Sequence, residues 1–252
     1  MLEITQLRKV YPDGTVALDG VDLTVPDGQF LAVIGLSGSG KSTLMRCINR
    51  LIEPTSGSVL IDGADVTAAN PERLRDIRRH IGMVFQQFNL VKRSSVLTNT
   101  LVGRLGYAST WGSLLHRFSR EDHELAMTNL GRVGIAEKAH QRADTLSGGQ
   151  QQRVGIARAL MQKPDLILAD EPVASLDPAT AHSILDHLEQ VNKQDGITVV
   201  CSLHFLSLAR RYADRVVALK AGRIVFDGGP EEIDDARFRE IYGEDAEEVE
   251  VG

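Results

Sequence analysis

The chain has 252 residues, 42% of them hydrophobic and 25% charged, which is an ordinary composition for a folded globular protein. This length suits one large domain or two small lobes with a substantial core. The net charge of −6 is concentrated at one end, because residues 231–252 carry ten acidic side chains and two arginines. That leaves +2 on the first 230 residues, which excludes a strongly basic nucleic-acid footprint, so we expect no nucleic-acid partner.

The sequence shows no pattern typical of a membrane span or an export signal. Its apolar runs, such as Ile197–Leu203, are far shorter than the roughly 20 residues that a spanning helix needs. Residues 1–4 lack the basic start and the apolar segment of a signal peptide. Cys47 and Cys201 have no metal or redox spacing, so we expect both to be buried as small apolar residues. These features predict a cytoplasmic protein.

Two kinds of strand are predicted in the first third of the chain. Residues 2–10 and 21–25 alternate apolar and polar side chains, which is typical of antiparallel strands. Leu31–Ile34 is apolar throughout and predicts a buried strand, which leads through a glycine-rich turn into a helix expected over Ser42–Ile52. The next predicted elements are a strand at Val59–Ile61, a helix that begins at Asn70–Pro71 and a strand at Ile81–Phe85.

Helical periodicity replaces the β-branched runs between residues 89 and 158, which predicts a helical lobe inserted between core segments 1–88 and 159–230. After it, apolar strands alternate with helices and predict a largely parallel sheet covered on both faces. The acidic segment 231–252 is expected to form a solvated terminal helix and a disordered end. The elements predicted after the lobe are a strand at Asp165–Ala169, a helix from Asp177 to Gln194, a strand at Ile197–Val200, a helix near Phe205–Tyr212 and a hairpin of Arg215–Leu219 with Arg223–Phe226.

The turn after the first buried strand has the pattern G-x-x-x-x-G-K-[ST]. Its glycines permit backbone angles that turn consecutive N–H groups toward a phosphate, and the positive end of the next helix faces the same anion. Lys41 is expected to reach the β- and γ-phosphates, Ser42 to ligate Mg²⁺ and Thr43 to bond near the α-phosphate. A nucleoside triphosphate site is therefore predicted at Gly35, Leu36, Ser37, Gly38, Ser39, Gly40, Lys41, Ser42 and Thr43.

Two further motifs suit phosphate chemistry. Asp170 and Glu171 end a buried strand, at the edge where parallel sheets place their ligands. Asp170 is expected to hold Mg²⁺ and Glu171 to polarise the attacking water, the alternative being two acids that cap a turn. The second motif is a glycine-rich helix start, which is either another anion site or an ordinary helix cap. Its residues are Ser147, Gly148, Gly149 and Gln150.

The order and spacing of these motifs resemble the nucleotide-binding subunits of ATP-binding cassette (ABC) transporters over residues 2–243. The resemblance implies an α/β fold, with a P-loop NTPase (RecA-like) core, a small antiparallel β-subdomain and the inserted helical lobe in a single domain of residues 1–243. It implies that Leu146–Gln150 is the family's signature sequence. It also implies ATP and Mg²⁺ as cofactors, with Lys41 and Glu171 among the catalytic residues.

Four single residues match the family by position. Tyr11 matches the aromatic that stacks on adenine, or is a packing tyrosine. Gln86 matches the glutamine that touches Mg²⁺, with Gln87 as an adjacent candidate. Asp177 matches the loop that crosses between subunits, or is a plain helix cap. His204 matches the catalytic histidine that contacts the γ-phosphate, or is structural.

The chain holds one copy of each motif. In this family the signature of one subunit completes the phosphate loop of another, so the resemblance implies a head-to-tail homodimer with ATP between the copies. It implies transmembrane permease subunits that dock near Gln86–Leu90, and a periplasmic or extracytoplasmic substrate-binding protein. It also implies a peripheral position on the cytoplasmic face of the inner membrane.

A narrower resemblance is to the ATPases of bacterial phosphonate importers, and it implies ATP hydrolysis that powers phosphonate import. Phosphite, another oxyanion or polar amino acids are alternative cargoes. A soluble cassette ATPase acting on chromosomes or ribosomes and a small-molecule kinase are alternative functions. The resemblance rests on Cys47–Gly57, Phe85–Val91, Val102–Tyr107, Ser109–Trp111 and Glu171–Asp177, whereas Lys92–Ser95 and Val200–Leu203 depart from that group's commonest forms.

Overall fold

A computed structural model describes residues 1–107 and 118–243 of the chain. The segment Ser109–Trp111 and the predicted disordered end therefore lie outside the described residues. The larger of the two sheets in the described residues has the strand order β10-β9-β3-β8-β7-β6, in which every neighbouring pair is parallel except the β9–β10 hairpin. This confirms the predicted, largely parallel sheet. Its strands are β3 (Phe30–Ile34), β6 (Ile81–Val84), β7 (Leu166–Ala169), β8 (Thr198–Ser202), β9 (Arg215–Lys220) and β10 (Arg223–Gly228).

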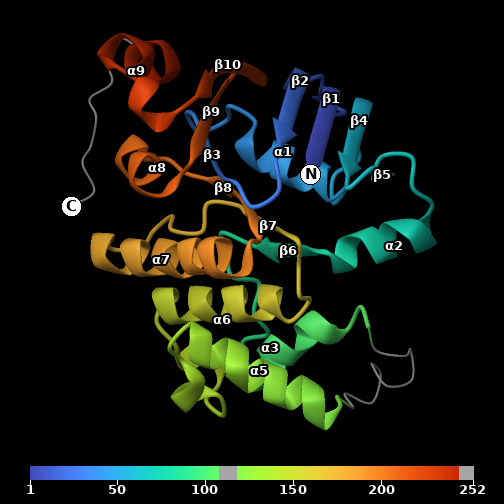
Figure 1. The fold of residues 1–252 in the computed structure, drawn as a ribbon, viewed down its shortest axis with the longest axis vertical. Helices are drawn as coiled ribbons and strands as arrows, with labels where there is room; N and C mark the ends of the chain where they lie inside the picture. Colours follow the sequence, from blue (N-terminus) through green and yellow to red (C-terminus); the bar gives the residue numbers. More distant parts are fainter. Residues whose placement is uncertain (108–117, 244–252) are drawn as a thin grey trace.

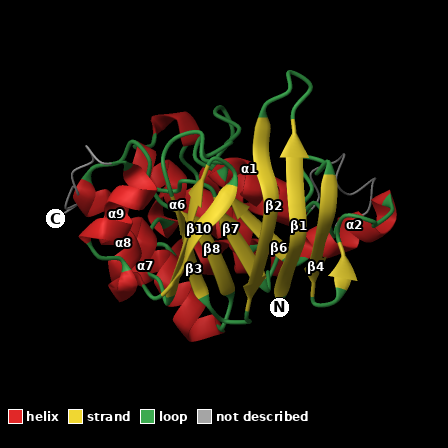
Figure 2. Cartoon of the chain, turned by 90° about the horizontal axis from the view of Figure 1, so that it is seen from above, coloured by secondary structure: helices red, strands yellow, loops and turns green. Residues whose placement is uncertain are grey.

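The smaller sheet is antiparallel and has the strand order β2-β1-β4-β5. Figure 2 shows it from above, beside the larger sheet. The predicted antiparallel strands are confirmed, although the second begins earlier than expected. Its strands are β1 (Leu2–Val10), β2 (Val16–Val25), β4 (Ser56–Ile61) and β5 (Ala64–Asp65).

Alternation along β3 explains how the larger sheet is covered on both faces. Leu31 and Val33 join a buried cluster with the small sheet and with α1 (Lys41–Ile48). Phe30, Ala32 and Ile34 point to the other face, into a cluster that includes side chains of three helices covering this face. Apolar side chains are buried on both sides of the strand, as expected for a central parallel strand. The three helices are α6 (Gly148–Leu160), α7 (Pro178–Asp195) and α8 (Leu206–Tyr212).

Below this sheet, α3 (Val96–Leu101) and α5 (Arg120–Arg132) pack with α6 (Figure 1). Short 3₁₀ turns, η1 (Val102–Arg104), η2 (Ala136–Lys138) and η3 (Ala143–Thr145), connect this region. Leu130 and Ile135 belong to the same buried cluster as Val84 of the sheet, because α6 lies between the two groups. The helices therefore share a continuous core with the sheet, and their separation as a lobe over 89–158 stays a prediction. Helix α2 (Pro71–Arg79) is capped by Asn70 as predicted.

The helix expected over Ser42–Ile52 ends at Ile48, so its predicted C-terminal boundary was wrong. The Asn49 side chain accepts a hydrogen bond from the Leu51 backbone N–H (3.1 Å), and Arg50 adopts a left-handed φ of 53°. Such a bond between a side chain and the nearby backbone competes with helix continuation. Leu51 consequently stays half exposed although its spacing suggested the core.

The acidic C-terminal segment contains η4 (Pro230–Glu232) and α9 (Asp235–Tyr242). A solvated helix was expected, but Phe238 and Ile241 are buried in the cluster that includes α8, so this expectation was wrong for one face of α9. The two apolar side chains are three residues apart and therefore share a face, which the high acidic content of the segment obscured. Among the described residues, no helix has both the length and the hydrophobicity to cross a membrane.

The buried face of α7 gives a direct test of the packing. Leu188 is fully buried there, so Leu188→Ala is expected to lower the free energy of unfolding by about 2–5 kcal/mol through lost contacts and a cavity. Gln194→Ala, at an exposed position of the same helix, should change it by less than about 0.5 kcal/mol. Urea unfolding followed by circular dichroism measures both, and equal small effects would contradict this packing.

Candidate nucleotide-binding site

The phosphate loop follows β3 and leads into α1, the context that the sequence predicted. Gly35 and Gly40 have φ values of +139° and +110°. A Cβ atom at these positions would lie 2.2 Å from the Leu219 carbonyl oxygen and 2.4 Å from the Ala17 carbonyl oxygen. Both positions therefore require glycine for conformation and for space. Around Gly38, in contrast, a Cβ would meet nothing within 4 Å, so the loop is open on that side.

Lys41 is folded into the loop that it closes. Its side chain is 3% exposed, and its Nζ donates hydrogen bonds to the carbonyl oxygens of Gly35 (2.7 Å) and Leu36 (3.1 Å). Burial lowers the pKa of this ammonium, and the nearby carboxylates of Glu171 and Asp170 only partly oppose the shift. The charge is therefore incompletely stabilised by the chain, and an anion in the loop would compensate its burial.

A cavity of about 250 Å³ opens between the phosphate loop and the turn after β1. The Tyr11 hydroxyl lies there, 3.2 Å from the Thr43 hydroxyl. The buried Ser39 hydroxyl of the loop has no hydrogen-bond partner among the described residues, but Ser39 does not line this cavity. The cavity is lined by Tyr11, Thr15, Ala17, Gly38, Gly40, Lys41, Ser42, Thr43 and Glu171.

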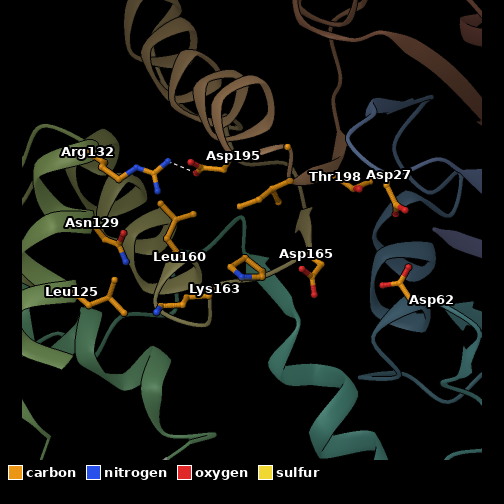
Figure 3. Close-up of a pocket in the computed structure, with 13 residues that line it drawn as sticks. Asp27, Asp62, Leu125, Asn129, Arg132, Leu160, Lys163, Asp165, Asp195 and Thr198 are labelled. Carbon is orange, nitrogen blue, oxygen red and sulfur yellow. Dashed lines mark hydrogen bonds and ion pairs between the residues drawn. The ribbon is translucent and has the colours of Figure 1, made fainter. Parts of the chain in front are cut away.

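A larger cavity of about 520 Å³ lies elsewhere (Figure 3). It is open between α5, the end of α6 and the turns that carry Asp27 and Asp62. Its lining includes Arg132 paired with Asp195, but none of the residues predicted for nucleotide binding. The candidate site is therefore the smaller cavity, because residues predicted to bind phosphate line it and do not line the larger one.

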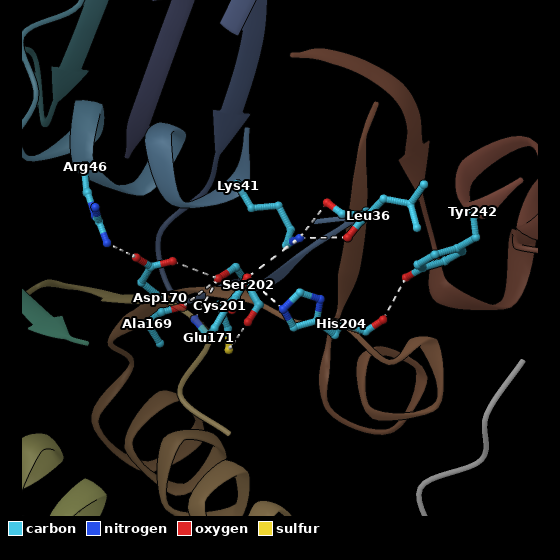
Figure 4. Close-up of polar contacts among 11 residues, drawn as sticks. Leu36, Lys41, Arg46, Ala169, Asp170, Glu171, Cys201, Ser202, His204 and Tyr242 are labelled. Carbon is cyan, nitrogen blue, oxygen red and sulfur yellow. Dashed lines mark hydrogen bonds and ion pairs between the residues drawn. The ribbon is translucent and has the colours of Figure 1, made fainter. Parts of the chain in front are cut away.

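The acidic pair and the histidine meet beside Lys41 (Figure 4). The Oε1 atom of Glu171 lies 2.8 Å from Nε2 of His204 and 3.8 Å from Nζ of Lys41. Asp170 is 1% exposed, and its carboxylate lies 3.4 Å from the Arg46 guanidinium. These contacts place an acid, a histidine and a cation around one point, which is the arrangement that phosphoryl transfer to water needs.

Strand order explains this convergence. β3, β8 and β7 are parallel neighbours, so their carboxyl ends share one edge of the sheet. The phosphate loop follows β3, Asp170–Glu171 follows β7, and His204 follows β8. Three segments far apart in the sequence are thereby brought to the edge where α/β sheets bind their ligands.

The glutamines and the aspartate that match the family by position are not joined to this cluster. Gln86 and Gln87 form an exposed turn after β6, and among the described residues no hydrogen bond links either side chain to the phosphate loop or to Asp170. The choice between them stays open. Asp177 caps α7, because its Oδ1 accepts a hydrogen bond from the Thr180 N–H (3.0 Å).

The second glycine-rich turn begins α6 with a capping box. The Ser147 hydroxyl accepts from the Gln150 N–H (3.4 Å), and the Gln150 side chain accepts from the Ser147 N–H (3.0 Å). These two bonds confirm that the turn caps α6, and anion binding by the same turn stays a prediction. Because α6 and α1 cover opposite faces of the larger sheet, the turn does not reach the chain's own phosphate loop through any hydrogen bond or ion pair in the described part.

Two contacts of the acidic pair were not predicted from the sequence. Arg46 lies one helical turn after Ser42 and so faces the same side of α1, a spacing that could have indicated it. Ser202 is a fully buried polar residue at the end of β8, and its hydroxyl contacts both Asp170 and Glu171. A polar residue ending an apolar strand was the available signal.

The donor set near the loop fits Mg²⁺. Among residues 1–107 and 118–243, no group of three or more His, Cys, Asp or Glu side chains could hold a metal by itself. Ser42 and Asp170 offer a hydroxyl and a carboxylate near the phosphate loop, and Mg²⁺ characteristically takes few protein oxygens beside water and substrate phosphates. The residues present therefore fit a magnesium ion that arrives with a nucleotide.

Comparisons with known proteins agree with the fold and the motifs. Residues 18–174 match the family model described as ABC transporter. The phosphonates import ATP-binding protein PhnC of Bdellovibrio bacteriovorus is 58% identical over 250 residues, which cover 99% of this chain and 96% of that protein. The protein of the same name from Shouchella clausii is 55% identical over 251 residues, which cover 100% of this chain and 94% of that protein.

Solved structures of ABC cassettes superpose on the chain. The dimeric structure of MJ0796, a bacterial ABC transporter cassette, has a TM-score of 0.82 at 36% identity and covers 91% of this chain and 99% of that one. Its post-hydrolysis state bound to ADP and Pi gives a TM-score of 0.81 with the same coverage. The chain therefore belongs to the ABC transporter family.

Proposed function

We propose that this chain is the ATP-hydrolysing subunit of an importer for phosphonates. The meeting of Lys41, Glu171 and His204 beside the phosphate loop carries the ATPase part of the proposal. Curated relatives at 55–58% identity, named as phosphonates import ATP-binding proteins, support the cargo. Within this chain, selectivity for a phosphonate is not expected, because it would reside in separate membrane and binding proteins.

The proposed mechanism gives each residue one task. The triphosphate lies along Gly35–Thr43, and Lys41 exchanges its loop carbonyls for the β- and γ-phosphate oxygens. Glu171 accepts a proton from water as the water oxygen bonds to the γ-phosphorus and the bond to ADP breaks. His204 contacts the γ-phosphate, and Tyr11 stacks on adenine. Ser42, Asp170 and Gln86 would hold Mg²⁺, which supplies positive charge to the phosphates when bound.

The proposed catalytic unit is a head-to-tail homodimer. Ser147–Gln150 lies on α6, away from the chain's own phosphate loop, and the N-terminal end of this helix has N–H groups suited to a phosphate. A second copy would present Ser147, Gly148, Gly149 and Gln150 to the nucleotide, with Asp177 at the crossing loop. The dimeric structure of the MJ0796 cassette supports the pairing of two copies.

The permease is proposed to dock in a groove of about 370 Å³ between α6 and the end of β6. Phe85, Asn89 and the exposed apolar Leu51 line it, and Asn89 belongs to the segment Gln86–Leu90. Docking there would hold the chain on the cytoplasmic face of the inner membrane. An extracytoplasmic binding protein would deliver the substrate to the permease.

Glu171→Gln tests the proposed hydrolysis. Loss of the general base is expected to lower the rate of phosphate release by roughly 100- to 10,000-fold, while an ATP-bound dimer accumulates in gel filtration. Glu124→Gln, on the exposed side of α5, should leave both measurements unchanged. Normal turnover in the Glu171 variant would remove this residue from the mechanism.

Lys41→Ala tests nucleotide binding separately from hydrolysis. A non-hydrolysable ATP analogue with Mg²⁺, at about 100 times its Kd, should raise the melting temperature of the unmodified chain by about 5–10 °C. The Lys41 variant should lose this rise, because the ammonium that pairs with the phosphates is gone. Lys163→Ala, exposed and outside the nucleotide cavity, should keep it. A retained rise in Lys41→Ala would argue against phosphate binding in this loop.

The cargo is tested with the permease and the substrate-binding protein of the proposed importer. Reconstituted in liposomes, the complex should hydrolyse ATP several-fold faster with a phosphonate than with phosphite, phosphate or a polar amino acid. If phosphite, phosphate or a polar amino acid stimulated hydrolysis more strongly, that compound would become the proposed cargo, and the proposed ATPase activity would stand. Recovery of ribosomes or DNA, with no multispanning protein, in a pull-down from solubilised membranes would instead favour a soluble cassette ATPase.

A further inference from the structure

One buried hydroxyl contacts three consecutive residues at the catalytic edge. Ser202, the last residue of β8, is fully buried, and its Oγ accepts a hydrogen bond from the Glu171 backbone N–H (2.8 Å). The same Oγ lies 3.4 Å from Oδ1 of Asp170 and 3.5 Å from the Ala169 carbonyl oxygen (Figure 4). Ser202 therefore contacts each residue of the segment Ala169–Glu171, which carries the proposed magnesium ligand Asp170 and the proposed base Glu171.

Glu171 needs such a contact because its backbone leaves the regular strand. The parallel pairing of β7 with β8 ends at Ala169 and Cys201, so the sheet offers the Glu171 N–H no partner of its own. Glu171 also has a φ of 48°, in the left-handed region that non-glycine residues rarely adopt. The bond to Ser202 satisfies this N–H and holds the unfavourable backbone conformation in place.

The hydroxyl proton serves the neighbouring acid. A serine hydroxyl has one proton to donate, and a carboxylate is a stronger acceptor than a peptide carbonyl. The Ser202 hydroxyl donates this proton to Oδ1 of Asp170. The Arg46 guanidinium lies 3.4 Å from the other carboxylate oxygen, Oδ2. The Ser202 hydroxyl thus accepts from the backbone N–H of Glu171 and donates to the carboxylate of Asp170.

We propose that Ser202 is a positioning residue for hydrolysis, which aims the Glu171 carboxylate at the γ-phosphate through its backbone. His204, two residues further along, contacts the tip of the same side chain, so the end of β8 holds Glu171 at both ends. The proposal rests on the proposed role of Glu171 as the base. The proposed role of Ser202 requires its hydroxyl, whereas a role in packing alone could be filled by any small buried side chain.

The test is ATP hydrolysis by the full chain with Ser202→Ala. The expected result is a fall in kcat of about 10- to 100-fold, with KM for ATP within about twofold, because the base is misdirected while the phosphate loop is intact. Ser202→Thr, which keeps the hydroxyl, should recover most of kcat. Cys201→Ala, a similar truncation at the next buried position of β8, should not lower kcat by more than about twofold.

A double-mutant cycle separates positioning from general damage. In a Glu171→Gln background, Ser202→Ala should not lower the residual rate further, since its effect passes through Glu171. If alanine prevents folding, Ser202→Cys fills the space with a weak acceptor and carries the same expected loss of kcat. Wild-type kcat in Ser202→Ala, or an equal further loss in the Glu171→Gln background, would overturn the proposal. Normal turnover in Glu171→Gln alone would instead overturn the proposed function.

Discussion

The parallel register of β3, β8 and β7 is the constraint on which the site depends. Because the three strands run the same way and lie side by side, the segments that follow them begin at one edge of the sheet. The cation of Lys41, the carboxylate of Glu171 and the ring of His204 come within hydrogen-bond or ion-pair distance there. A change in strand order would separate them even if every motif stayed in the sequence.

The site is held in a strained and incompletely compensated state. The Lys41 ammonium is buried with a lowered pKa, donates to two loop carbonyls and pairs with Glu171 at 3.8 Å, and Glu171 keeps a left-handed backbone. Functional sites often contain such unfavourable features, which the surrounding structure enforces. The contacts that enforce them reach far along the chain, since the Tyr242 hydroxyl of α9 donates to the His204 carbonyl oxygen (3.2 Å). The C-terminal helix is therefore connected to the catalytic edge.

Much of this could be predicted from the sequence, because glycine-rich turns and apolar strands constrain the backbone locally. The phosphate loop, the parallel sheet and the acidic pair after β7 follow from such local patterns, whereas His204 was indicated by the resemblance to a family. Contacts between distant segments could not be predicted this way. The bond from Glu171 to Ser202 and the buried face of α9 leave only weak signals within one element, because the partner in each case depends on how neighbouring elements pack. The end of α1 at Ile48 depended on one side-chain bond of Asn49.

The central claim is that each nucleotide site combines the phosphate loop of one copy with the signature turn of another. Mixing two inactive variants tests it most directly: Lys41→Ala removes the loop cation, and Ser147→Arg blocks the turn. A head-to-tail heterodimer of the two contains one site with both defects and one site with neither. The account predicts that equimolar mixing restores a substantial part of the ATP hydrolysis that each variant lacks alone. No recovery, with heterodimers demonstrably formed, would contradict it.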